Sequence, residues 1–302
     1  VNSLASLLQE QGKLEEAETL YRRALEVNER VLGDDHPDTL GSINNLGLLL
    51  KDQGKLEEAE VLLRRDLEGS ERVMGADDPD TLASFCNLGF LLQRQGKLDE
   101  AEPLFRRNLE DSERVLGADH RDTLTSINSL GGLLQDQGKY DEAEPLLRRA
   151  FEAFERVLRV NHPDTLESVN FLGRLLQAQG KYDEAEPLLR RCLEERERTL
   201  SANHPFTLMS LTNLGSLLQD QGKLEEAELL HRRALEVQER VLRVNHPDTL
   251  YTRGNLGSLL IKRGDDSGKG MVCDVLSSLL SSPNSLTKTH PWIKKFNQAL
   301  AL

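Results

Sequence analysis

The stretch His36-Pro37-Asp38-Thr39-Leu40 decides the fold, because close copies of it return along the chain at a constant spacing. The copies begin 42 residues apart, at positions 36, 78, 120, 162, 204 and 246. The second copy begins with Asp78 in place of histidine, and the third has Arg121 in place of proline. A fixed period of this length is typical of stacked supersecondary units, so the sequence predicts a repeat protein.

Helical periodicity fills each repeat. In the first complete repeat, leucine and isoleucine recur three or four positions apart over residues 40–50, and a second apolar stripe covers residues 56–67. Gly54 separates the two stripes. Pro37 and Asp38 suit the first turn of a helix, where a missing N–H is harmless and a carboxylate is favoured. Each repeat is therefore predicted to contain helix A, a tight turn, helix B and a longer loop.

Two further features return with the same period. Gly47 in helix A and Ala59 in helix B predict close approach of the two helices. Helix B also carries glutamate four residues before arginine, as at Glu60 and Arg64, a spacing that supports a helix by ~0.2–0.5 kcal/mol. We interpret these charges as a solvated surface paired within each helix rather than as catalytic carboxylates.

The framework Asn45-Leu46-Gly47, Leu50, Ala59 and Leu63 resembles the tetratricopeptide repeat (TPR). The 42-residue length and the phrase Gln-Gly-Lys-Leu-Glu-Glu-Ala-Glu are more narrowly similar to kinesin light chain repeats. The resemblance implies an all-α, right-handed superhelical solenoid of stacked helix-turn-helix units. It predicts an array over residues 1–263, with a partial first unit, five full units and a final helix A, followed by a degenerate capping or tail segment over residues 264–302.

Composition limits the classes of partner. The chain has 302 residues and a formal net charge of -13, which disfavours binding to nucleic acid or to an anionic membrane surface. No apolar run approaches the roughly 18 residues of a membrane span. The three cysteines are scattered, without a C-x-x-C motif, which suits a reducing compartment and predicts a cytoplasmic protein.

The resemblance places the binding site on the concave face, which helix A lines in this family. Asparagines recur around the Leu-Gly framework there, and their amides can hold an extended peptide backbone. They can equally bond to neighbouring helices, and both interpretations stay open. Phe171 replaces one asparagine, and with Arg174 and Arg94 it forms the predicted local anchor. The predicted groove residues are Asn44, Asn45, Asn87, Arg94, Asn128, Asn170, Phe171, Arg174, Asn213 and Asn255.

Motifs for catalysis or metal binding are not found. The repeated histidines lie one unit apart, roughly 8–10 Å, and so cannot converge on one ion. We expect them to serve helix entry or loop packing, and Asp78 in one copy fits a helix cap better than a metal ligand. The segment from Gly264 to Gly270 lacks the spacing of a phosphate loop and is predicted to be a flexible turn. His231 and His290 are predicted to lie on the surface. We expect no enzyme activity, no cofactor and no metal.

The C-terminal segment contains two apolar stretches. The stretch from Met271 to Leu280 predicts a short helix that covers the end of the stack, and Ser281-Ser282-Pro283 predicts a linker. Trp292, Ile293, Phe296 and Leu300 then follow at near-helical spacing. They predict either a second capping helix or a peptide that docks on the chain's own groove or on a partner.

These features favour a protein-interaction scaffold or adaptor that binds partner peptides. By resemblance the partners would be a kinesin heavy chain or its cargo, although the coiled coil that attaches a light chain to its motor is not seen in this sequence. The alternative is a sensor or oligomerisation arm of a larger nucleotide-binding switch protein.

Overall fold

The computed structural model describes residues 2–242, 244–281 and 291–301, which form fifteen α-helices without any strand. This confirms the all-α prediction. The helices are α1 (Asn2–Glu10), α2 (Leu14–Leu32), α3 (Pro37–Gln53), α4 (Leu56–Val73), α5 (Pro79–Arg94), α6 (Leu98–Leu116), α7 (Arg121–Asp136), α8 (Tyr140–Leu158), α9 (Pro163–Ala178), α10 (Tyr182–Thr199), α11 (Pro205–Asp220), α12 (Leu224–Val241), α13 (Pro247–Lys262), α14 (Ser267–Ser281) and α15 (Pro291–Leu300).

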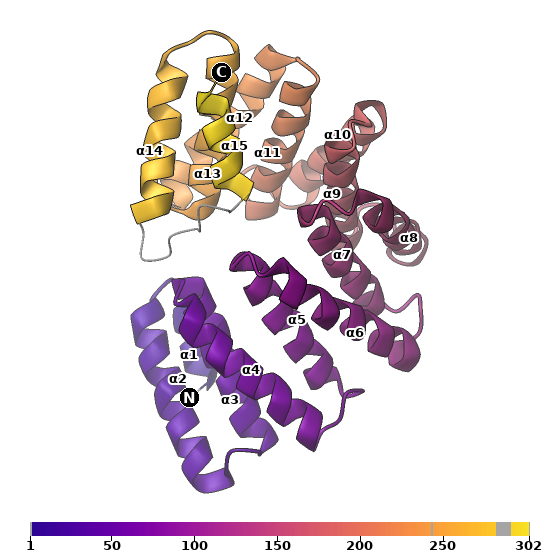
Figure 1. The fold of residues 1–302 in the computed structure, drawn as a ribbon, viewed down its shortest axis with the longest axis vertical. Coiled ribbons are helices and arrows are strands. Elements are labelled where there is room, and N and C mark those ends of the chain that lie inside the picture. Colours follow the sequence, from indigo (N-terminus) through magenta and orange to yellow (C-terminus); the bar gives the residue numbers. More distant parts are fainter. Residues whose placement is uncertain (1, 243, 282–290, 302) are drawn as a thin grey trace. The chain divides into compact units, whose positions relative to one another are not determined.

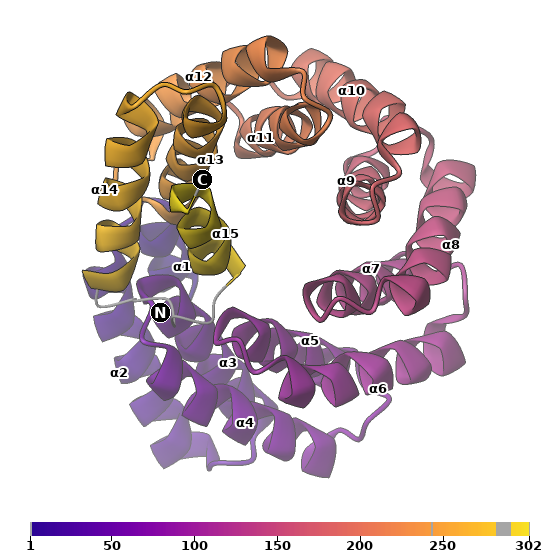
Figure 2. The same cartoon turned by 45° about the horizontal axis from the view of Figure 1, so that its top comes forward.

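The chain divides into two compact units, Val1–Leu133 and Leu134–Leu302, and the division falls inside α7. In the first unit the pairs α1–α2, α3–α4 and α5–α6 follow one another (Figure 1). In the second, α8 is followed by the pairs α9–α10, α11–α12 and α13–α14, and then by α15. Within each unit the helix A members form one layer and the helix B members form the other (Figure 2). Each unit is thus a solenoid of stacked helix-turn-helix repeats.

The repeated histidine caps helix A. His36 Nδ1 accepts a hydrogen bond from the backbone N–H of Asp38 (3.1 Å), which satisfies one of the free donors of the first helical turn. Asp78 does the same with the N–H of Asp80 (2.9 Å), which explains why aspartate can replace histidine there. The same bond is made by His120, His162, His204 and His246.

Glycine allows helix A and helix B to approach closely. A Cβ atom at Gly47 would lie 2.8 Å from Leu63 Cδ2, and one at Gly89 would lie 2.8 Å from the Phe105 ring. Real Cβ contacts are almost never this short, so a larger residue would push the two helices apart. Gly54 ends α3 in the left-handed conformation (φ 77°) that the tight turn to α4 requires.

The helix B charges pair across repeats as well as within them. Arg64 contacts Glu60 of its own helix at 2.8 Å, as predicted. Glu60 also accepts from Lys97 of the following repeat at 2.7 Å, and Arg64 also reaches Glu100 at 2.7 Å. The expectation of a surface paired within each helix was therefore incomplete. A glutamate and an arginine one turn apart can each contact the next repeat because they lie on the edge that adjoins it.

We call these contacts the boundary set. The covering helix B presents Glu, Arg and Glu at positions i, i+4 and i+11, and the following repeat presents Lys, Glu and Arg at positions j, j+3 and j+10. The Lys–Glu pairs are Lys55–Glu18, Lys97–Glu60, Lys181–Glu144 and Lys223–Glu186. The Arg–Glu pairs of helix B are Arg22–Glu58, Arg64–Glu100, Arg148–Glu184 and Arg190–Glu226. The Arg–Glu pairs of the following repeat are Arg65–Glu29, Arg107–Glu71, Arg191–Glu155 and Arg233–Glu197.

Two C-terminal helices complete the second unit. Helix α14 packs beside α13 in the place of a helix B, and α15 packs against both. Because α14 begins at Ser267, the second half of the predicted turn from Gly264 to Gly270 is helical instead. Ser281, the first residue of the predicted linker, is instead the last residue of α14, whereas Ser282, Pro283 and the predicted surface residue His290 lie outside the described residues. The shared core consists of Leu250, Val272, Val275, Leu276, Leu279, Ile293 and Phe296.

The prediction that His231 lies on the surface is wrong, because its side chain is 0% exposed. It fills the core position that Leu147 and Leu189 hold in earlier repeats, against Gly215 of helix A. Neither ring nitrogen has a hydrogen-bond partner among the described residues. Burial, together with the positive charge of Lys295, lowers the pKa of His231 to about 3, so the ring is neutral in the folded chain.

Replacing His231→Leu should raise the urea midpoint of unfolding, because it restores the leucine of the preceding repeat and removes a buried unbonded ring that costs about 1–3 kcal/mol. The pKa of His231 is lower in the folded chain than in the unfolded chain, so protonation of the ring favours the unfolded chain. The wild-type protein therefore loses stability as pH falls from 6.5 toward about 3. The leucine variant should lack this part of the pH dependence. Identical pH slopes for the two proteins would contradict the assignment.

Replacing Glu186→Gln should destabilise the chain by roughly 1 kcal/mol or less at neutral pH, as is usual for a partly exposed ion pair. Hydrogen bonds from Lys223, Gln221 and Arg190 outweigh the effect of burial and lower the pKa of Glu186 to about 2. The stability that ionised Glu186 provides is therefore fully present above the ordinary glutamate pKa of 4.5, and it is lost as pH falls from 4.5 toward 2.

Urea midpoints at pH 7, 4 and 2.5 test this expectation. The matched control is Glu236→Gln, which removes an exposed carboxylate of α12 and should leave the midpoint unchanged. A deficit of the Glu186→Gln variant that persists undiminished at the lowest pH would argue against the ion pair as its cause.

Candidate functional site

The exposed side of helix A forms the candidate binding surface. We call it the helix A face: the outward side chains of α3 and α5 in the first unit, and of α9, α11 and α13 in the second. Its framework leucines and glycines are buried and constant. In these five helices and in α7, another position of helix A points outward and differs in every repeat. It is occupied by Gly41, Ala83, Thr125, Glu167, Met209 and Tyr251.

Several predicted groove asparagines bond to each other across repeats. Asn87 donates to Asn44 Oδ1 (3.0 Å), and Asn213 donates to Asn170 Oδ1 (3.4 Å). Asn255 is fully buried and donates to the hydroxyl of Ser216 (3.3 Å). These amides therefore link neighbouring helices, which is one of the two interpretations left open by the sequence. Asn45 is half-buried and Asn128 is buried.

The predicted anchor residues are distributed over both units. Phe171 is half-buried and Arg174 is exposed, and they lie one turn apart on α9. Arg94 ends α5 in the first unit, where its charge adds to burial in lowering the pKa of Lys51. The structure thus brings Phe171 and Arg174 together on one helix, while the anchor itself stays a prediction.

The helix A face of the second unit contains a pocket that the sequence analysis did not identify. It has a volume of about 180 Å³ and lies between α11 and α13, near the end of α12. Phe206 and Met209 of α11 are 45% and 37% exposed there, and Tyr251 of α13 lines the other side. Thr212 and Thr252 share a hydrogen bond of 3.1 Å within the pocket. An apolar recess with a few polar groups is the usual form of a binding site.

Phe206 was detectable in the sequence. Four of the six copies of the repeated pentapeptide read His-Pro-Asp-Thr-Leu or differ from it only at the first residue, whereas the fifth has Phe206 in place of the aspartate. A bulky apolar residue in place of an exposed charge marks a binding site only where it joins a larger apolar patch, and here it lies beside Met209 and Tyr251. In the structure the Arg196 guanidinium lies 5.3 Å from the Phe206 ring centroid, which holds the ring at the pocket edge.

Helix α15 covers part of the helix A face at α13. The Trp292 ring lies 4.6 Å from that of Tyr251, and the Phe296 ring lies against Gly254, which holds the position of Asn44 and Asn170. Both predicted interpretations of this segment are thus partly met, since α15 also packs on α14.

Tyr251 stands between positive charges. Burial raises its pKa, but Lys295 and Arg174 favour the phenolate and bring the pKa below its usual value. Positive charge therefore lies near Tyr251, while the carboxylate of Asp248 also lines the pocket on the α13 side.

Neither a metal site nor a membrane-spanning segment is seen in the part of the chain that the structure describes. No group of three or more His, Cys, Asp or Glu side chains is arranged to hold an ion there. No helix within those residues is both long and apolar enough to cross a bilayer.

A stack of helix pairs with one exposed helix A layer defines a repeat scaffold of the class that binds other proteins. The chain belongs to the tetratricopeptide repeat family, whose model matches residues 1–72, 38–107, 80–156, 126–198, 164–240 and 207–267. No match is found among curated proteins.

Three solved structures illustrate the likeness. The nearly identical TPR-like repeats of a candidate kinesin light chain from Podosopora anserina are 29% identical, covering 69% of this chain and 99% of that one, with a TM-score of 0.56. BtubC (BKLC) from P. vanneervenii is 21% identical, covering 76% and 92%, with a TM-score of 0.61. A tetratricopeptide repeat protein from Parabacteroides merdae is 17% identical, covering 99% and 97%, with a TM-score of 0.58. The last two show the fold alone.

Replacing Gly254→Asn should displace α15, because a Cβ atom at this position would overlap the Phe296 ring. Trp292 is the only tryptophan in the sequence, so its fluorescence reports on α15 directly. We expect emission to shift to longer wavelength as the indole becomes hydrated. The control is Gly270→Asn in α14, where an added Cβ atom would meet no other atom within 4 Å. Unchanged emission in the Gly254 variant would show that α15 does not depend on this contact.

Proposed function

We propose that this chain is a scaffold that binds partner peptides along the helix A face, with the pocket of Phe206, Met209 and Tyr251 as its main anchoring point. The observation that carries the proposal is the exposure of two large apolar side chains beside a recess of about 180 Å³. An apolar side chain of the peptide would fill the recess and gain the burial energy of its hydrocarbon surface.

The rest of the helix A face supports the same proposal. Side chains that vary on a constant framework are what selectivity for a peptide requires. Asn87 and Asn213 each use one amide N–H to bond to the previous repeat. The second N–H and the carbonyl oxygen can then bond to a peptide backbone. Phe171 and Arg174 on α9 would extend the contact beyond the pocket, as an aromatic residue beside an arginine is common in binding hot spots.

We further propose a kinesin light chain-like adaptor role, with a motor heavy chain or a cargo protein as the partner. The 42-residue repeat and the likeness to the Podosopora anserina repeats support it. A cytoplasmic location is proposed on the free state of Cys86, Cys192 and Cys273. In this proposal the chain acts by binding and not by catalysis.

Selection of peptides from a random display library against the chain tests the anchoring point. We expect the selected peptides to share a large apolar residue. Their affinity should fall at least tenfold for Phe206→Asp, which restores the residue of the other repeats and so preserves the fold. Met209→Ala should weaken binding in the same direction, because it removes one wall of the pocket. Fluorescence anisotropy with the synthetic peptides measures both effects.

The matched control is Leu229→Ala, which truncates a leucine of α12 that is exposed on the helix B layer. It should leave the affinity unchanged. Peptides that bind the Phe206→Asp variant as well as the wild type, or that depend on Leu229, would contradict the assignment of the pocket.

A further inference from the structure

The recess between α11 and α13 contains a buried amide that no residue in the described part of the chain satisfies. Gln238 of α12 lines the recess, and its side chain is only 3% exposed. Its Oε1 has no hydrogen-bond partner among the described residues. Such an oxygen is unfavourable, because it has lost its hydrogen bonds to water and has gained none in return. An occupant of the recess that supplies a donor would remove this cost.

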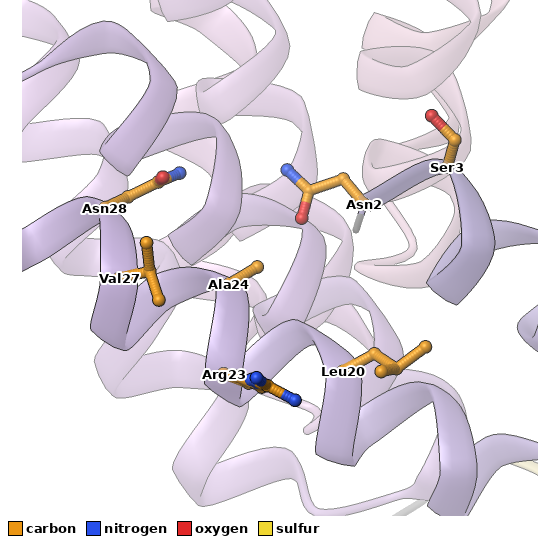
Figure 3. Close-up of a pocket in the computed structure, with 7 residues that line it drawn as sticks. All are labelled: Asn2, Ser3, Leu20, Arg23, Ala24, Val27 and Asn28. Carbon is orange, nitrogen blue, oxygen red and sulfur yellow. The ribbon is translucent and has the colours of Figure 1, made fainter.

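The same position has a structural task in other repeats. Asn28 of α2, which borders the hollow shown in Figure 3, donates to the carbonyl of Asp38 (3.1 Å) and to the hydroxyl of Ser42 (2.9 Å). Arg196 of α10 makes the same two bonds to the helix A that follows it, at 3.0 Å each. Gln238 makes no such bond to α13 within the described residues. Its amide therefore does not hold helix A in place, and it is left for an occupant.

The shape of the recess suits one large side chain with a polar end. Phe206 and Met209 of α11 are exposed at its mouth, and Tyr251 of α13 forms another wall. Helix α12, which carries Gln238, belongs to the helix B layer behind α11 and α13 (Figure 2). The volume of about 180 Å³ is below the roughly 300–1,000 Å³ of a small-molecule site. A side chain that enters from the helix A face would thus meet apolar walls first and bring its far end to the amide.

Tyrosine matches both parts of the recess. Its ring can pack edge to face against Phe206 and Tyr251 and can contact the thioether of Met209. Its hydroxyl can donate to Oε1 of Gln238 and accept from Nε2, so it satisfies the amide in either orientation of the last torsion. Tryptophan supplies a donor alone, and phenylalanine supplies neither a donor nor an acceptor. The phenol is therefore the best complement of this recess.

Lysine, which also has an apolar stem and a donor at its end, fits less well. Its ammonium would exchange water for one neutral acceptor at Gln238. The ammonium of Lys295 already lies 5.4 Å from the Tyr251 ring centroid on this side. Asp248 lines the recess too, but its carboxylate is 61% exposed and so stays hydrated. These contacts favour a phenol over an ammonium.

We propose that the recess selects a tyrosine side chain of the partner peptide, and that Gln238 determines this specificity by a hydrogen bond to its hydroxyl. The inference rests on the proposed function, because it names the residue that the anchoring point accepts. It also sets the direction of the preference. Apolar burial alone would favour phenylalanine, whereas a buried amide that needs a partner rejects the side chain without the hydroxyl.

Peptides from the display selection test the inference, and the residue that they share should be tyrosine. Each peptide is synthesised with tyrosine or with phenylalanine at this position, and its affinity is measured by fluorescence anisotropy. The wild-type chain should bind the tyrosine form at least fivefold more tightly. Gln238→Met keeps the length of the side chain and removes both hydrogen-bonding groups, so the preference should disappear or reverse. This double-mutant cycle separates the hydrogen bond from any general weakening of the recess.

A second probe, N-acetyltyrosinamide, needs no selected peptide. The sequence contains three methionines, so isotope labelling of their methyl groups gives few NMR signals, and Met209→Ala identifies the signal of Met209. Titration with N-acetyltyrosinamide at millimolar concentration should shift this signal. N-acetylphenylalaninamide at the same concentration should shift it less, and the difference should be lost in Gln238→Met.

The matched control is Gln11→Met, which makes the same change of residue at an exposed site between α1 and α2. It should leave the preference for tyrosine unchanged. Circular dichroism checks that both variants keep the helical content of the wild type.

Equal affinity of the wild-type chain for the two peptide forms would overturn the inference, and so would a tyrosine preference that survives in Gln238→Met. Tighter binding of a tryptophan form would assign the amide to an indole N–H and would also overturn it. Selected peptides that share leucine or phenylalanine and depend on Phe206 would remove this inference and leave the proposed function standing. Peptides that ignore Phe206→Asp would instead remove the proposed function, and the N-acetyltyrosinamide titration would then decide whether the recess binds a phenol.

Discussion

The boundary between successive repeats is the contact on which the structure depends. A single helix pair cannot bury its leucines alone, so each pair relies on its neighbour to cover Leu46 and Leu49 or their counterparts. Burial of these side chains supplies most of the energy, at about 1.5–3 kcal/mol for each leucine. The boundary set adds less energy per contact, because its pairs are partly exposed. It adds register instead, since only one alignment of two repeats pairs all three charges.

Much of the architecture followed from the sequence because its causes are local. The period, the capping role of His36 and the close approach at Gly47 each depend on residues within one repeat. The pairing of Glu60 with Lys97 could not be inferred in this way, because it depends on which edge of helix B adjoins the next repeat. The spacing of 37 positions between a glutamate and a lysine recurs in the sequence, but only the structure shows that the two side chains touch.

The candidate site was less predictable for a related reason. The asparagines around Asn87 were chosen for their capacity to bond to a peptide, and the structure shows that the same capacity joins neighbouring helices. Phe206 departs from the repeat, but the recess beside it could not be inferred, because the recess depends on how α11 and α13 pack. The prediction for His231 failed because it rested on the residue type. The position of His231 in the repeat is that of a core leucine, and this decides its burial.

Helices α14 and α15 cover the apolar seam of the repeat that begins at α13. At the C-terminal end, α14 and α15 bury the last apolar seam, and Gly254 gives up the side chain of its counterparts so that Phe296 can pack there. Leu4 and Leu7 keep the residue types that every later repeat buries, because the boundary between repeats follows one pattern throughout the described chain.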